Sequence, residues 1–168
     1  SWELPLDTTA VATALNSQPN HNPSTNEGLF DNKMFPAVSD GVSYLHIRFK
    51  NGAGWGETNH YRIAVDTKAP VPFEITSSEG ATSNNPAPTL NFNSTDALSG
   101  IREYRTKIDN DAWLSVSGKD YTGAYRVGAK EPGKHRLTVQ AVDNAGNSIE
   151  NTFDYEIIAL PSPTLTFS

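Results

Sequence analysis

Two stretches of this chain repeat one pattern, in which two alternating strands are joined by a turn that contains glycine. In residues 133–157, Leu137 and Val139 alternate with polar side chains, and a second alternation of apolar and polar residues ends at Ile157. A period of two indicates half-buried strands, and residues 143–147 between them favour a tight turn. This stretch therefore predicts a β-hairpin.

The same pattern occupies residues 41–65. Gly41 and Gly54 stand in this stretch where Gly133 and Gly146 stand in the later one, at equal spacing. Self-similarity on this scale indicates similar domains in tandem. Because no segment shows sustained helical periodicity, the predicted fold class is all-β, with two β-sandwiches that follow one another along the chain.

A proline-containing segment marks the boundary between the two domains. Pro70 and Pro72 each fix φ and restrict the residue before them, which makes this segment an extended and fairly stiff connector. We therefore predict a first domain over residues 1–66, a second over 67–160, and a linker with the opening strand of a further domain over 161–168.

The first domain is expected to be incomplete at its N-terminus. The second domain has a candidate first strand at residues 73–75, and the beginning of the first domain has no counterpart of it. Short strands are expected at residues 2–4 and 34–38. The Asn-, Pro- and Ser-rich residues 16–33 predict a long connection.

Charge and composition exclude several classes of partner. The formal net charge of −6 and the pI near 5.1 argue against nucleic acid or an anionic membrane as partner. The chain has no cysteine, so it can form neither a disulfide nor a thiolate metal site, which favours a prokaryotic over a eukaryotic extracellular protein. No apolar run approaches the roughly 18–20 residues that span a bilayer, so a targeting or anchoring segment is expected outside this fragment.

Three motifs resemble those of bacterial immunoglobulin-like repeats, which are themselves similar to fibronectin type III domains. Residues 66–70, 96–101 and 141–147 read DTKAP, DALSGI and AVDNAGN. The first domain matches less closely, through residues 51–56 and 65–67. The resemblance implies seven-stranded Greek-key sandwiches in extracellular or cell-wall proteins, where such domains act as spacers, adhesive modules or accessories beside a catalytic domain.

Three aspartates are expected to meet at the junction between the domains. In a sandwich of this topology, the lead-in segment, the loop between the second and third strands and the last hairpin turn lie at one end. That placement would bring together Asp66, Asp96 and Asp143, whose mutual repulsion a hard cation would cancel. Calcium takes about 6–8 oxygen ligands, and further oxygens could come from Asn144, Asn147 and Asp40. The alternative is that these side chains only cap turns by accepting backbone hydrogen bonds.

Aromatic and histidine side chains of the first domain offer weaker candidates. Trp2 and Trp55 could stack on a sugar ring, or they could pack against a missing strand or an upstream neighbour. His46 and His60 fall on opposite strands of the first hairpin and are expected to point outward. They could then be two solvated histidines or a two-histidine transition-metal site.

The sequence carries no catalytic motif that we recognise, such as a Gly-x-Ser-x-Gly elbow or a His-Glu-x-x-His helix. We therefore expect a non-enzymatic spacer or adhesion stalk fragment of a larger extracellular surface protein, which calcium could stiffen at the interdomain junction. Its expected partners are neighbouring immunoglobulin-like domains of the same chain and an unidentified surface ligand or glycan. The alternative function is a carbohydrate-binding accessory module of a secreted hydrolase, to which Trp2 and Trp55 would contribute.

Overall fold

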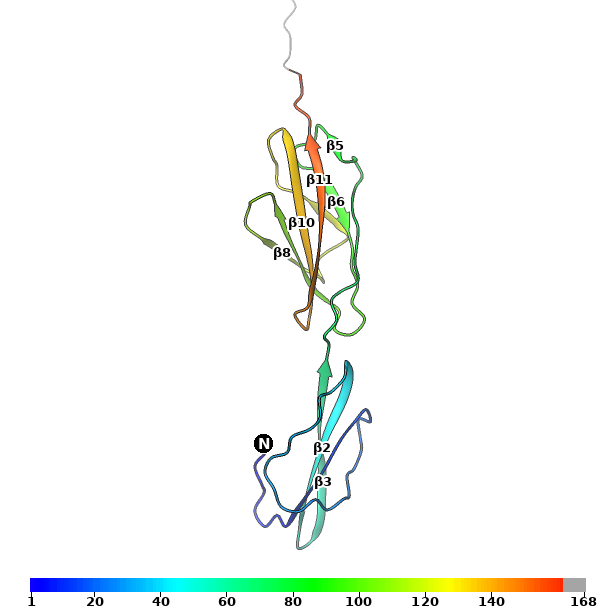
Figure 1. Ribbon diagram of the computed structural model, residues 1–168, viewed down its shortest axis with the longest axis vertical. Coiled ribbons are helices and arrows are strands. Elements are labelled where there is room, and N and C mark those ends of the chain that lie inside the picture. Colours follow the sequence, from blue (N-terminus) through cyan, green and yellow to red (C-terminus); the bar gives the residue numbers. More distant parts are fainter. Residues whose placement is uncertain (162–168) are drawn as a thin grey trace, which may run out of the picture. The chain divides into compact units, whose positions relative to one another are not determined.

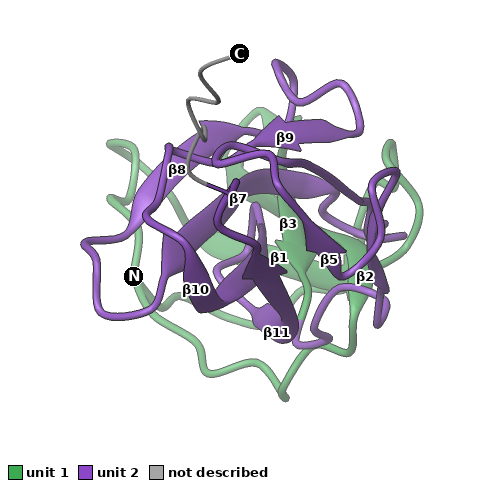
Figure 2. Ribbon diagram, turned by 90° about the horizontal axis from the view of Figure 1, so that it is seen from above, with its two compact units in different colours: residues 1–66 green, residues 67–168 purple. Residues whose placement is uncertain are grey.

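The computed structural model describes residues 1–161 of the 168-residue chain. Every regular element in this part is a β-strand, which confirms the predicted fold class (Figure 1). The chain divides into two compact units, Ser1–Asp66 and Thr67–Ser168, which Figure 2 colours separately. Within residues 1–161 no helix has the length and apolar character needed to cross a bilayer. The strand predicted near the C-terminus, within residues 161–168, lies outside the described residues.

The described strands of the first unit form one antiparallel sheet in the order β1-β2-β3. Their bounds are β1 (Ala10–Asn16), β2 (Gly41–Asn51) and β3 (Gly54–Val65). Strands β2 and β3 form the predicted hairpin, and Gly54 at its turn has a φ of 121°, a value that side chains disfavour. Residues 2–4 and 34–38 form no strand, so those two predictions are wrong.

The long connection between β1 and β2 is attached to the free edge of β1. The N–H of Val11 donates to the carbonyl of Gly28 at 2.8 Å, and the N–H of Glu27 donates back to Val11 at 3.1 Å. The carboxylate of Glu27 also accepts hydrogen bonds from the N–H and hydroxyl of Thr13, at 2.7 and 2.8 Å, and pairs with Lys33. The connection therefore covers a strand edge that would otherwise expose unpaired backbone groups.

The second unit is a sandwich of two sheets, with strand orders β5-β11-β10-β7-β8 and β4-β6-β9. Its strands are β4 (Ile75–Ser77), β5 (Thr82–Ser83), β6 (Thr89–Phe92), β7 (Ile101–Ile108), β8 (Leu114–Ser117), β9 (Ala124–Arg126), β10 (Gly133–Asp143) and β11 (Ser148–Ile157). Strands β10 and β11 form the hairpin predicted from the alternation, with Leu137 paired to Phe153. The core between the sheets includes the fully buried Leu90 of β6 and Leu137 and Val139 of β10.

The lead-in segment of the second unit is attached to the loop that follows β6. The N–H of Val71 donates to the carbonyl of Thr95 at 2.8 Å, and the hydroxyl of Ser94 donates to the carbonyl of Val71 at 2.5 Å. Pro70, next to Val71, is fully buried. These contacts hold the segment that begins at Thr67 beside the residue that precedes Asp96.

Candidate metal centre

Asp96 closes the turn between β6 and β7. Its Oδ1 accepts hydrogen bonds from the N–H groups of Ser99 at 2.7 Å, Gly100 at 2.8 Å and Leu98 at 3.2 Å. Burial alone would raise the pKa of Asp96, but the hydrogen bonds from Gly100, Ser99 and Leu98 outweigh it, so that the pKa lies below its ordinary value. Asp96 is therefore held in its charged form.

Asp143 plays the same part in the turn between β10 and β11, and its side chain is fully buried. Its Oδ1 accepts hydrogen bonds from the N–H groups of Gly146 at 2.6 Å and Asn147 at 2.8 Å, and its Oδ2 accepts one from Nδ2 of Asn147 at 2.9 Å. Gly146 has a φ of 99°, which permits the tight turn around the carboxylate.

The two turns are joined through Asn144. Its N–H donates to the carbonyl of Gly100 at 3.0 Å, and its Nδ2 donates to the carbonyls of Ser99 at 2.8 Å and Gly100 at 3.0 Å. The loop that carries Asp96 and the hairpin turn that carries Asp143 therefore lie side by side at one end of the second unit.

The carboxylates of Asp66, Asp96 and Asp143 can each offer one oxygen that lies within 4.8 Å of the other two. Asp66 follows the last residue of β3 and is bonded directly to Thr67, the first residue of the lead-in segment described above. The group is thus assembled from a lead-in segment, an interstrand loop and a hairpin turn. Oxygen-rich groups of this kind suit hard cations such as calcium.

The remaining predicted ligands divide between the two units. Asp40 precedes Gly41, which pairs with Val65 across β2 and β3, so Asp40 comes to the same end of the first sheet as Asp66. Asn144 and Asn147 both use their amide nitrogens as donors within the second unit. A cation role for Asp40 and for both asparagines stays a prediction.

Turn capping and cation binding are compatible at these carboxylates. The capping alternative is confirmed for Asp96 and Asp143, because both accept backbone hydrogen bonds within their own turns. A carboxylate has two oxygens with about four acceptor positions in total, so capping does not use all of them. The hydrogen bonds fix where the oxygens lie before any cation arrives.

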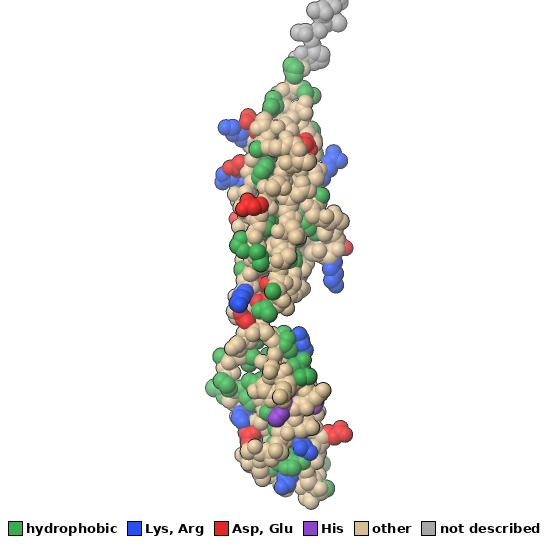
Figure 3. All heavy atoms as spheres, turned by 90° about the vertical axis from the view of Figure 1, so that its right-hand side faces the viewer, with side chains coloured by type: hydrophobic (Ala, Val, Ile, Leu, Met, Phe, Trp, Pro, Cys, Tyr) green, Lys and Arg blue, Asp and Glu red, His purple; other side chains and the backbone are tan. Residues whose placement is uncertain are grey.

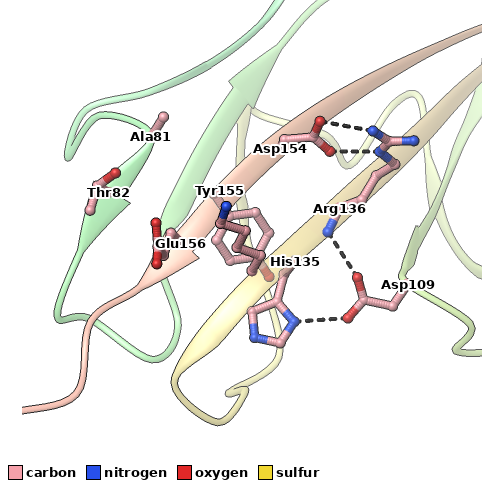
Figure 4. A pocket seen from close by; sticks show the side chains of 9 residues that line it. Ala81, Thr82, Asp109, His135, Arg136, Asp154, Tyr155 and Glu156 are labelled. Atoms are coloured by element: carbon pink, nitrogen blue, oxygen red, sulfur yellow. Dashed lines mark hydrogen bonds and ion pairs between the residues drawn. The ribbon is translucent and has the colours of Figure 1, made fainter.

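The hollow in Figure 4 contains the residues that most resemble catalytic groups. His135 places Nδ1 2.8 Å from Oδ2 of Asp109 (Figure 4). Its Nε2 lies 2.9 Å from the carbonyl of Glu131. The hydrogen bonds with Asp109 and Glu131 raise the pKa of His135. Arg136 is likewise paired with Asp154 through two bonds, at 2.6 and 2.8 Å. Since both ring nitrogens face acceptors, His135 has none left to act as a general base on a substrate.

The two tryptophans line separate hollows of the first unit. Trp2 packs edge-on against Phe30 at a ring-centroid distance of 5.5 Å, and its indole N–H donates to the carbonyl of Phe30 at 3.2 Å. Trp55 lies near the β2–β3 turn, with the cationic groups of Arg48 and Lys50 each 5.8 Å from its ring. Glycan binding by these side chains stays a prediction.

The expectation of two solvated histidines is wrong for one of them. His60 is exposed, but His46 is fully buried and lies 2.7 Å from His60 between their Nδ1 atoms. The alternation placed both side chains on the face opposite Leu45 and Ile47, but it could not show that His21 of the long connection packs over His46. The sequence feature that could have indicated this cluster is the presence of three histidines within 40 residues.

Comparisons with known proteins give similarity to solved structures alone. No family model matches the chain, and no curated protein matches it. Among solved structures, the crystal structure of chicken CNTN1 FN1-FN3 domains aligns at 16% sequence identity and a TM-score of 0.44. The alignment covers 91% of this chain and 56% of that one.

Proposed function

We propose that this chain is a non-catalytic spacer or adhesion stalk fragment of a larger extracellular protein, from a prokaryotic cell surface or cell wall. Calcium would bind beside the bond between Asp66 and Thr67 and would stiffen the chain there. Neighbouring immunoglobulin-like domains of the same chain and a surface ligand or glycan would be its partners. The observation that carries the proposal is the grouping of three carboxylates within 4.8 Å.

Electrostatics favour a cation at this group. Two unit charges 4 Å apart repel by about 1 kcal/mol even in water, and by more where solvent is partly excluded. Asp143 is fully buried, and the pKa of Asp96 is lowered by hydrogen bonds that outweigh its burial. A bound divalent cation would replace this repulsion with attraction, and the lead-in segment would then be tied to both turns through Asp66.

The expected affinity suits a stiffening role rather than a requirement for folding. Extracellular calcium modules have Kd values of about 10⁻⁴–10⁻³ M. Calcium at about twenty times its Kd would stabilise the bound state by about 1.8 kcal/mol. That amount is a modest fraction of the stability of an ordinary domain.

The polar groups of the second unit support a non-catalytic role. In the hollow of Figure 4, His135 and Arg136 are each bonded to a carboxylate of the same unit, so their charges are already compensated. A catalytic site needs groups aimed at a substrate rather than at one another.

Melting curves and solution scattering in calcium and in chelator test the proposal. Calcium should raise the melting temperature and reduce the radius of gyration, and Asp66→Asn should remove both effects. Asp120→Asn is the matched control, because it makes the same charge change at an exposed residue of the second unit and should leave both effects intact. Superimposable curves with and without calcium would rule out the cation.

A further inference from the structure

A cluster of histidines in the first unit lies apart from the carboxylate group. His46 of β2 and His60 of β3 are direct partners in the antiparallel register, so their side chains leave the same face of the sheet. Their Nδ1 atoms lie 2.7 Å apart, and their ring centroids lie 4.9 Å apart. Histidine side chains reach the surface of this unit in the space-filling view (Figure 3).

The connection between β1 and β2 brings a third imidazole to this pair. The ring centroid of His21 lies 5.6 Å from that of His46, at an interplanar angle of 60°. Tyr44, two residues before His46 on the same face of β2, stacks on His46 with an interplanar angle of 18°. Aromatic rings therefore surround His46, which explains why its side chain is fully buried.

The far nitrogen of His46 is positioned by an amide oxygen. Nε2 of His46 lies 3.2 Å from Oδ1 of Asn16, at the end of β1. When Nε2 carries the hydrogen and donates it to Asn16, Nδ1 presents its lone pair toward His60. A second partner that fixes the tautomer in this way is a regular feature of histidines that bind metals.

Two arginines share this face with the histidine pair. Arg48 of β2 and Arg62 of β3 each lie two residues from a member of the pair, and Nε of Arg48 donates to the carbonyl of Gly56 at 2.5 Å.

Solvent can reach the open side of the pair. His60 is exposed and lines a hollow of about 570 Å³, together with Asn22, Arg48, Trp55, Gly56, Glu57 and Thr58. A metal ion could enter here and complete its coordination with water.

From this geometry we propose that His46 and His60 form a transition-metal site, whose remaining coordination positions are filled by water. Imidazole ligands suit Zn²⁺, Cu²⁺ and Ni²⁺. In a tetrahedral zinc site with Zn–N bonds of about 2.0–2.1 Å, two ligating nitrogens lie about 3.3 Å apart. The pair therefore needs to open by about 0.6 Å, which a small rotation of the exposed His60 side chain supplies.

The test is a titration of the intact chain with Cu²⁺, followed by electron paramagnetic resonance and calorimetry. We expect one saturable site, whose spectrum shows coordination by at least two imidazole nitrogens. His60→Gln should weaken binding by at least about tenfold, since it removes a ligand, and Asn16→Ala should weaken it by about tenfold, since it releases the His46 ring. His135→Gln, the matched control in the second unit, should bind Cu²⁺ as the unaltered chain does.

His60 is exposed, so its replacement should not prevent folding, and a melting curve of the variant checks this point. Equal affinity in His60→Gln and the unaltered chain would overturn the proposal. So would the absence of saturable binding, because His46 and His60 would then share only a hydrogen bond. The Asp66→Asn variant should bind Cu²⁺ with nearly unchanged affinity, so failure of this site and failure of the calcium site can be told apart.

Discussion

The hydroxyl of Tyr121 donates a hydrogen bond to the carbonyl of Phe92 at 2.8 Å and lies 3.2 Å from the N–H of the same residue. The two rings also stack, with centroids 4.7 Å apart and planes 10° from parallel. Tyr121 thus satisfies the backbone at the end of β6. The hydroxyl of Tyr155, by contrast, is buried and has no hydrogen-bond partner among residues 1–161.

This contrast predicts that removing the two hydroxyl groups has different effects on the free energy of unfolding. Tyr121→Phe should lower the free energy of unfolding by about 1–2 kcal/mol, because backbone groups of Phe92 lose their partner. Tyr155→Phe should be neutral or stabilising, because it removes a polar group that is buried without compensation. Urea unfolding of both variants provides the measurement. If Tyr155→Phe lowered the free energy of unfolding as much as Tyr121→Phe, the hydroxyl of Tyr155 would have to make a hydrogen bond after all.

The same two tyrosines predict a loss of stability in alkali. Burial raises the pKa of both Tyr121 and Tyr155 from 10.0 to about 12. Between these values the folded state binds more protons than the unfolded state, so stability falls as pH rises above about 10. Alkaline melting curves, together with the ultraviolet absorbance of tyrosinate, check this expectation. Tyrosine ionisation at the ordinary pKa while the fold persists would argue against it.

Gly118 predicts a strong effect of a single methyl group. A Cβ at this position would lie 2.6 Å from the carbonyl oxygen of Ile101 and 3.2 Å from that of Arg102. Both oxygens belong to the backbone of β7, so they cannot easily move. Gly118→Ala should therefore lower the free energy of unfolding by about 1–3 kcal/mol. Gly128→Ala is the matched control, since a Cβ there meets no atom within 4 Å. Equal melting temperatures of the two variants would refute the close approach.

The pair of Asp109 and His135 predicts a pH window. The hydrogen bond that His135 donates to the carboxylate of Asp109 raises the pKa of His135 above 6.5. Burial would raise the pKa of Asp109, but its bonds with His135 and the N–H of Arg136 lower it below 3.8. The contribution of His135 to stability is complete below about pH 6.5 and is lost as the pH rises through the pKa of His135 in the folded state. The contribution of Asp109 to stability is present above about pH 4 and is lost as the pH falls through its lowered pKa. Stabilisation by the pair is therefore greatest between these two limits.

Asp109→Asn tests this window, because asparagine tolerates the left-handed backbone at this position, where φ is 51°. The variant should melt lower than the unaltered chain near pH 5.5, and the difference should shrink in mild alkali, where His135 is neutral in both proteins. The effect should be small, because Asp109 is partly exposed. A difference that is constant across this range would contradict the proposed ionic pair.

Much of the fold could be predicted because local alternation and turn composition agree with the tertiary structure. Leu137 and Val139 are fully buried in β10, as the period of two predicted, and Gly146 occupies the predicted turn. Residues 2–4 and 34–38 have similar local patterns but form no strand. A strand needs a neighbour to pair with, and β2 already has β1 and β3 on its two edges.

The grouping of the three carboxylates was more accessible to sequence reasoning than the burial of His46. Chain order and turn composition were enough to predict that Asp96 and Asp143 lie in turns at one end of the second unit. The burial of His46 instead depends on the course of the connection that carries His21, which local periodicity does not encode. The unpaired hydroxyl of Tyr155 could not be predicted for the same reason, because it depends on the packing of segments that are distant in the sequence.

Amide chemical shifts recorded during a calcium titration report on the three aspartates at the level of single residues. We expect saturable shifts with a Kd of about 10⁻⁴–10⁻³ M, concentrated at the N–H groups that donate to the carboxylates, those of Gly100, Gly146 and Asn147. These shifts should disappear in Asp66→Asn and persist in Asp120→Asn. Amide signals that stay unmoved at calcium concentrations well above this range would show that the three aspartates form no calcium site.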